Sequence, residues 1–237
     1  MSLRLYVVPA SHPCAAVQSA LRLKGFEYKL TELPPGLHAA HQRLRFGART
    51  VPSLKADGEK VSGSRAIMRW LEERRPEPAL WPADPAQRAA VEEAEAWGDE
   101  VLQPLVRRVI WWSLRRRPDA MPSFLAQSKL PVPAWAARMS GPMTSVVEWR
   151  LNEVSEEAVR SDVASLPSLL GRVSGWIDEG VVGGASPNAA DLQIGSSLAL
   201  LRTVGDVAPV IDASPAAALA SRWFPGYPGS IPPGTLS

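Results

Sequence analysis

The sequence predicts an α/β domain followed by an all-helical domain, and three observations support this fold class. Short apolar segments alternate with helical patterns up to residue 75, and four prolines between Pro76 and Pro85 then interrupt all periodicity. Beyond them, apolar residues recur at three- and four-residue steps with no comparable hairpin signal. We expect domains at 1–75 and 88–224, a linker at 76–87 and a Pro- and Gly-rich tail at 225–237.

The first domain begins with a strand and a helix. Residues 3–8 form a short apolar run bounded by a proline, which is typical of a buried strand. Pro13 suits the first turn of a helix, and Gly25 lies where that helix would end. The buried face of this helix would carry Cys14, Val17 and Leu21.

The rest of the first domain completes the order β-α-β-α-β-β-α. Residues 26–30 predict a strand and residues 37–44 a short helix. A further strand at 52–56 turns through Asp57-Gly58, a strong hairpin signal, into an antiparallel strand at 59–62. Ser64 then caps a helix to residue 74. A parallel first pair and an antiparallel hairpin make one small α/β domain.

The second domain contains only helical patterns. Apolar residues over 91–112 predict one long helix, which Pro104 would kink. Further helices are expected at 146–159 and 162–179, the second interrupted or started near Pro167.

Residues 188–191 resemble a helix capping box, with Asn and Asp in place of the usual Ser/Thr and Glu. An apolar run at 192–201 follows directly, so a helix is expected there. The tail is dense in Pro and Gly, and we expect it to be extended or mobile.

Composition narrows the class of protein. The chain has 237 residues and is 46% hydrophobic, which supports a well-formed core. Its net charge is +2, and basic residues are mixed with acidic ones except at 115–117, which argues against a nucleic-acid partner. One cysteine implies no intramolecular disulfide, and neither a leader nor a long apolar segment is evident. We expect a cytoplasmic protein with no membrane partner.

Four local motifs, in this order and spacing, resemble the cytosolic glutathione S-transferase superfamily. They are the loop 9–14 after the first strand, Val51-Pro52, the stretch 63–67, and the capping motif 187–191. The resemblance covers residues 1 to about 205. It implies a thioredoxin-like N-terminal domain, an all-helical C-terminal domain and a cis Val51-Pro52 bond. It also implies glutathione or a similar thiol as co-substrate, no permanently bound cofactor, a role in detoxification and a homodimer.

The resemblance places Ser11 and Cys14 at the catalytic position. Only a thiolate attacks electrophiles well, and a Ser11 hydroxyl beside a helix N-terminus would stabilise one. Ser11 is alternatively a helix cap. Cys14 is either a small buried side chain or a reactive thiol. His12 belongs to the expected thiol site as a base, or is instead a solvated or capping residue.

Four further residues are expected to bind the thiol co-substrate. The Val51-Pro52 edge would pair with a peptide-like ligand, and the alternative is an ordinary strand start. Ser64 and Arg65 begin a helix whose free N–H groups can bind a carboxylate, and the alternative is simple capping. Gly63 stands where relatives carry Glu or Gln, the side chain that contacts the amino group of glutathione.

The substrate pocket would be walled by Trp97, Trp111 and Trp112, or these side chains form core. Arg107, Arg108 and residues 115–117 are interpreted as solvated helix face, with an anionic ligand as the alternative. The three histidines and one cysteine form no recognised zinc spacing, so no metal is expected.

The sequence is compatible with two functions. One is transfer of glutathione or a related thiol to an electrophile, or a related thiol-assisted isomerisation or dehalogenation. The other is a non-catalytic binding protein of the same fold that holds apolar ligands or a protein partner. For a homodimer, we expect the contact between residues 64–74 and the long helix near Val91.

Overall fold

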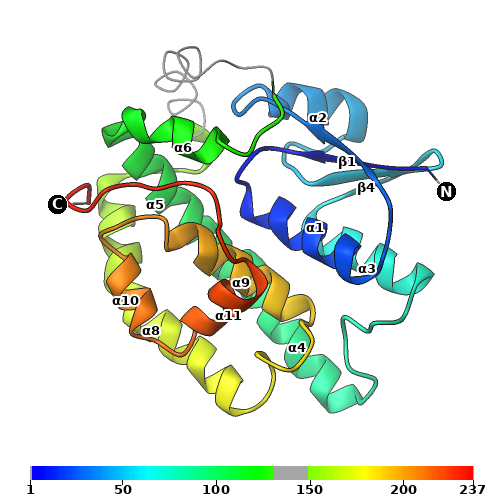
Figure 1. The fold of residues 1–237 in the computed structure, drawn as a ribbon. Helices are drawn as coiled ribbons and strands as arrows, with labels where there is room; N and C mark the ends of the chain where they lie inside the picture. The colour runs from blue at the N-terminus through cyan, green and yellow to red at the C-terminus, as the bar shows by residue number, and fades with distance from the viewer. Residues whose placement is uncertain (1, 131–148, 237) are drawn as a thin grey trace.

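The computed structural model describes residues 2–130 and 149–236, and it confirms an α/β part followed by a helical part (Figure 1). The first part comprises β1 Leu3–Val7, α1 His12–Leu23, β2 Lys29–Glu32, α2 His38–Phe46, β3 Ser53–Ala56, β4 Glu59–Ser62 and α3 Ser64–Arg74. The second part comprises α4 Pro85–Trp97, a π-helical segment Gly98–Leu102, α5 Gln103–Arg116, a 3₁₀ turn Pro118–Ala120, α6 Met121–Leu125, α8 Glu156–Asp178, α9 Ala189–Leu201, α10 Ala208–Asp212 and α11 Ala217–Trp223.

The strands form one mixed sheet in the order β2-β1-β3-β4. β1 and β2 are parallel, with Leu5 opposite Leu30, so α1 serves as the crossover between them. β3 is antiparallel to β1 and, through the predicted Asp57-Gly58 hairpin, to β4. In Figure 1, α1 and α3 lie on one side of the sheet and α2 on the other. The loop between β1 and α1 therefore emerges beside the helical part.

α1 follows the predicted pattern. Pro13 lies in its first turn, and Cys14, Val17 and Leu21 are each at most 1% exposed. Gly25, with φ at 64°, ends the helix in a left-handed conformation that costs glycine little.

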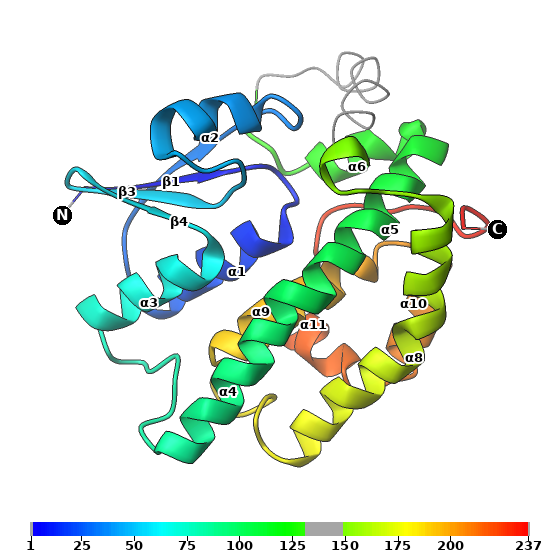
Figure 2. The same cartoon turned by 180° about the vertical axis from the view of Figure 1, so that it is seen from behind.

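α9 is buried along its whole length and packs against α1, α4 and α11 (Figure 2). The predicted capping box is confirmed: Asn188 Oδ1 accepts the Asp191 N–H at 3.0 Å, and the Asp191 carboxylate accepts the Asn188 N–H at 3.0 Å. The same carboxylate accepts the Gly183 N–H at 2.7 Å. Because α9 contacts α1 directly, this cap also helps to hold the helical part against α1 and the loop before it.

The single helix predicted over 91–112 is divided. α4 ends at Trp97, and a π-helical segment separates it from α5. Pro104 lies in the first turn of α5, where its missing N–H is tolerated. In place of the kink expected at Pro104, the helix is interrupted just before it by the π-helical segment.

The helix predicted at 146–159 is confirmed only in part: residues 149–151 and 156–159 are helical, but a break separates them. Residues 146–148 lie outside the described residues, and residues 152–155 are not helical because Glu153 has φ at 53°. Ser155 caps α8 by accepting the Ala158 N–H at 3.1 Å. α8 then continues through Pro167 instead of starting or breaking there.

Two boundaries in the first part also differ from expectation. β2 begins at Lys29, whereas Phe26 leaves the sheet and packs against Trp70 with ring centroids 6.3 Å apart. α3 begins at Ser64, but its cap is Gly63, so the capping role predicted for Ser64 is wrong.

In its described part the tail consists mainly of turns and bends, and Ile231, which is only 1% exposed, forms a bridge with Val204. Among the described residues, no helix has the length and apolar character needed to span a bilayer.

Candidate active site

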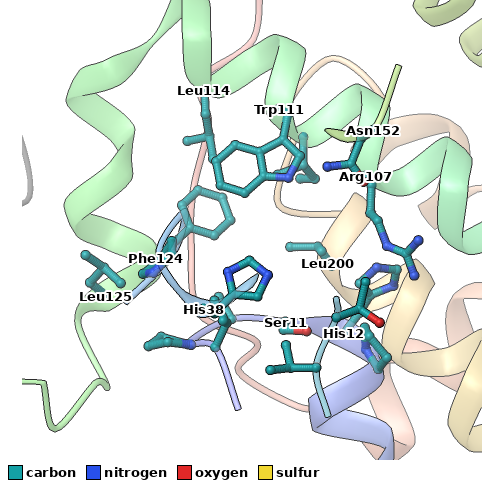
Figure 3. A pocket seen from close by; sticks show the side chains of 18 of the residues that line it. Ser11, His12, His38, Arg107, Trp111, Leu114, Phe124, Leu125, Asn152 and Leu200 are labelled. Carbon is teal, nitrogen blue, oxygen red and sulfur yellow. The ribbon is translucent and has the colours of Figure 1, made fainter. Parts of the chain in front are cut away.

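A cavity of about 150 Å³ lies where the loop after β1 meets α5 and α6 (Figure 3). Its apolar wall consists of Ile110, Trp111, Leu114, Met121, Phe124 and Leu125. Polar groups reach it from Ser11, His12, His38, Thr50, Arg107 and Asn152. A mainly apolar cavity with a few converging polar groups is typical of a small-molecule site.

Ser11 occupies the N-cap position of α1 with an extended backbone, yet its side chain makes no capping hydrogen bond. The alternative interpretation of its hydroxyl as a helix cap is therefore wrong. The hydroxyl hydrogen-bonds with the Cys14 thiol, and Ser11 lines the cavity. A hydroxyl at the positive end of a helix is suited to donate to an anionic sulfur there.

Cys14 is 1% exposed and does not line the cavity. Burial raises the pKa of its thiol to about 11, although the hydrogen bonds with Ser11 and Val8 and the charge of Arg107 act in the opposite direction. At neutral pH the thiol is therefore protonated and a poor nucleophile. Of the two interpretations of Cys14, the structure favours the small buried side chain.

His12 is buried and lines the cavity. Its Nδ1 lies 3.0 Å from Ser197 Oγ, and that hydroxyl donates its own proton to the Gln193 carbonyl at 2.8 Å. Ser197 can then only accept, so Nδ1 carries the ring proton and Nε2 is an acceptor. Nε2 has no hydrogen-bond partner among the described residues. Burial, and secondarily the charge of Arg107, hold the pKa of His12 well below its ordinary value, so the ring is neutral.

Arg107 reaches the cavity from α5, and Figure 3 shows its side chain extending toward His12. Its guanidinium donates to Gln103 Oε1 at 2.5 Å. The interpretation of Arg107 as solvated helix face is wrong, whereas its neighbour Arg108 forms a bidentate pair with Asp162. The available sequence signal was the four-residue spacing from Arg107 to Trp111, which puts both on one helix face.

The Val51-Pro52 bond is cis, as predicted. Val51 lines the cavity, whereas Pro52 is buried beside it and its carbonyl accepts the Gly63 N–H at 2.9 Å. His38 and Asn152 also line the cavity, and no sequence motif indicated either residue.

Ser64 and Arg65 do not line the cavity. Ser64 Oγ accepts a hydrogen bond from Gln193 Nε2 at 2.9 Å. Arg65 faces acidic groups of the helical part, at 3.1 Å from Glu100 and 3.7 Å from Glu95. The structure therefore turns these two side chains toward the interface between the two parts of the chain.

Of the three tryptophans expected in the pocket, only Trp111 lines this cavity. Trp97 packs edge-on against Trp176, with ring centroids 5.2 Å apart. Trp112 packs against Trp149 at 5.1 Å. Within the described ranges, no group of three or more His, Cys, Asp or Glu side chains is arranged to hold a metal ion.

Comparison with known proteins identifies the class. Residues 5–79 match the model of the glutathione S-transferase N-terminal domain. Probable maleylacetoacetate isomerase 1 of Drosophila melanogaster is 49% identical over 55 residues, 23% of this chain and 22% of that protein. Glutathione S-transferase 1 of Manduca sexta is 30% identical over 131 residues, 51% of this chain and 60% of that protein.

Solved structures are similar over almost the whole chain. A glutathione S-transferase from Rhodospirillum rubrum has a TM-score of 0.63 at 24% identity, covering 94% of this chain and 86% of that one. The beta-etherase LigF from a Sphingobium strain has a TM-score of 0.69 at 20% identity, covering 94% of both chains. These structures establish the glutathione S-transferase fold.

Residues 5–79 thus match the glutathione S-transferase N-terminal domain, and the chain as a whole has the glutathione S-transferase fold, with a thioredoxin-like part before a helical part. Its matched segments span between about a fifth and three fifths of the length of the curated relatives described above.

Proposed function

We propose that this chain is a glutathione-dependent transferase, in which the sulfur of glutathione or a similar thiol attacks an electrophilic carbon in the cavity. The observation that carries the proposal is the Ser11 hydroxyl, which begins α1, does not cap it and lines a mainly apolar cavity. The family match of residues 5–79 supports a thiol co-substrate.

In this mechanism the bound thiol loses its proton to solvent, and its sulfur then forms a bond to carbon as a leaving group departs or, with a conjugated carbonyl, as the resulting enolate takes up a proton from solvent. Ser11 donates a hydrogen bond to the sulfur anion, and the α1 N-terminus and Arg107 add positive potential. Lowering a thiol pKa by about two units needs about 2.7 kcal/mol, which a charged hydrogen bond and a helix end can together supply.

For the thiol co-substrate we retain the predicted binding residues as part of the proposal. The backbone of Val51 at the cavity would pair with the peptide-like part of glutathione, with His12 beside its sulfur. The first N–H groups of α3, at Ser64 and Arg65, would hold a carboxylate. Gly63 leaves the amino group without the contact that relatives provide.

A matrix of thiols and electrophiles tests the function. Glutathione, cysteine and other small thiols are each combined with aryl halides, conjugated carbonyls and alkyl halides, and the rate is compared with that of the uncatalysed reaction. The proposal requires thiol-dependent turnover above background for at least one pair. Heat-inactivated protein is the control.

A thiol-assisted cis–trans isomerisation is a second candidate. It is favoured by similarity to proteins named maleylacetoacetate isomerase, including the mouse protein, 39% identical over 80 residues, and by the Arg107 guanidinium, which could hold a carboxylate of the substrate. The thiol would add to a double bond, the resulting single bond would rotate, and elimination would release the thiol again. Substoichiometric thiol then suffices, whereas a transferase consumes one thiol per product.

A non-catalytic binding protein is the remaining alternative, and Gly63 is the residue that favours it. It predicts ligand binding in the cavity with no thiol-dependent rate.

We further propose a cytoplasmic homodimer whose contact involves α3 and α4. Sedimentation equilibrium measures its mass directly, and a monomer at micromolar concentration would contradict this assembly.

A further inference from the structure

The C-terminal segment is fastened to the helical part. The carboxylate of Asp206 accepts the backbone N–H groups of three consecutive residues, Gly234, Thr235 and Leu236, at 2.6 to 3.2 Å. Ile231 donates its N–H to the Thr203 carbonyl and accepts from Gly205, both at 2.8 Å. A segment with this many backbone hydrogen bonds has a defined path, which passes the N-terminal end of α1 (Figure 1).

Near its start, this segment contacts the loop that carries Ser11. Tyr227 is partly buried, and its hydroxyl donates to the Ala10 carbonyl oxygen at 2.9 Å. Burial holds the pKa of the phenol well above its ordinary value, so the hydroxyl remains a donor. The contact joins residues 217 positions apart in the chain.

The Ala10 carbonyl and the Ser11 N–H belong to the same planar peptide unit. The N–H side donates to the Val8 carbonyl at 3.2 Å, and the carbonyl side accepts from Tyr227. Fixing both sides of a plane fixes its rotation, and this rotation sets the direction in which the Ser11 side chain leaves the backbone. Ala10 itself has φ at 57°, a left-handed conformation that a non-glycine residue adopts only where its surroundings hold it.

The same segment also contacts the apolar wall of the cavity. A Cβ added to Gly229 would lie 2.3 Å from the Phe124 ring, so the backbone of the segment packs directly on that ring. Phe124 lines the cavity on the opposite side from Ser11. One segment thus contacts both sides of the site.

We propose that Tyr227 is a positioning residue for the Ser11 hydroxyl, so that the C-terminal segment is part of the active site. The inference rests on the proposed thiol chemistry at Ser11. Tyr227 acts through the Ala10–Ser11 peptide and does not touch the reacting atoms. Without its hydroxyl, the peptide plane rotates and the Ser11 hydroxyl points away from the sulfur for part of the time.

Tyr227→Phe tests this, since it removes one oxygen and keeps the ring. We expect kcat to fall about tenfold or more, because small misplacements at a reacting centre have such effects, while KM for the thiol stays within about twofold. The apparent pKa of the bound thiol, read from the dependence of the rate on pH, should rise by about one unit. Tyr28→Phe is the matched control: it also removes a hydrogen-bonded phenol hydroxyl, one that faces Arg22 outside the cavity, and should leave the rate and pH profile unchanged.

The Ser11→Ala background separates positioning from a general structural effect. If Tyr227 acts through Ser11, adding Tyr227→Phe to Ser11→Ala costs no further activity, whereas a general loosening of the fold lowers the rate again. An active parent whose rate and pH profile survive Tyr227→Phe overturns the positioning role alone. A parent with no thiol-dependent turnover overturns the proposed function, and the positioning role with it.

Discussion

Replacing Ser11 by Ala should remove most thiol-transfer activity and leave stability almost unchanged. A hydrogen bond to a charged group contributes about 1.5–3 kcal/mol, so the rate at neutral pH should fall about 10- to 100-fold. The pKa of the bound thiol should rise by about one to two units, at about 1.4 kcal/mol per unit. Because the Ser11 side chain makes no capping hydrogen bond, the loss of stability should be below the roughly 1 kcal/mol that a lost cap costs.

The assay is kcat/KM as a function of pH for the best thiol and electrophile pair, with urea unfolding of each variant. Ser19→Ala is the matched control, because Ser19 lies on the same helix, bonds to Arg22 and is outside the cavity. It should keep the parent rate.

Cys14→Ala provides the contrast. The thiol is buried with its pKa raised to about 11 and does not line the cavity, so its loss should spare turnover. Removing one buried sulfur should cost about 1 kcal/mol of stability. The reasoning fails if Cys14→Ala abolishes activity and Ser11→Ala does not, since the chain would then be a single-cysteine enzyme that forms mixed disulfides.

Three further predictions concern Gly63, His12 and the α9 cap. Gly63→Gln should tighten glutathione binding, measured by calorimetry, but should lower the stability of the fold by about 1–2 kcal/mol because φ is 91° at this position. Gly63→Ala is the control, since it has the same backbone strain but no amide group. Equal affinities of the two variants for glutathione would disprove the proposed contact. Burial lowers the pKa of His12 in the folded chain, so below pH 6.5 only the unfolded chain takes up a proton there. The free energy of unfolding should therefore decrease as the pH drops below 6.5, by about 1.4 kcal/mol at pH about 5.5. His12→Gln should reduce that loss by the same amount, as measured by urea unfolding at two pH values. Asn188→Ala should cost about 1–2 kcal/mol by removing the α9 cap, and an unchanged urea midpoint would contradict its role.

Local signals predicted most of the first part of the chain. The Asp57-Gly58 hairpin and the Asn188 capping box depend on contacts within a few residues, so their sequence patterns were sufficient. Phe26 shows where such patterns fail: its apolar character suited a strand, but packing on Trp70 across the domain removed it from the sheet. Glu153 likewise interrupts the helix predicted at 146–159, because its backbone adopts a left-handed conformation. A pattern of apolar residues does not predict such a conformation.

Apart from Trp111, the candidate site was predicted only where its residues lie close together in the sequence. The loop residues Ser11 and His12 and the cis Val51-Pro52 bond follow from motifs within the first part. Arg107 and Tyr227 reach the loop from distant helical and C-terminal segments, and no pattern in one sequence reports which distant residues meet. The domain boundaries remain a prediction.

Burial and charge together set the sign of the potential inside the cavity. Burial lowers the pKa of both His12 and His38, so both rings are neutral at pH 7. Arg107 is then the one charged side chain among the described residues that line the cavity. An entering thiolate or carboxylate therefore meets a positive charge and no lining carboxylate to repel it, in a mainly apolar space where that attraction is weakly screened. Because an arginine side chain stays charged throughout the physiological pH range, this preference for anions should persist there, and any pH dependence of turnover should come from the bound thiol.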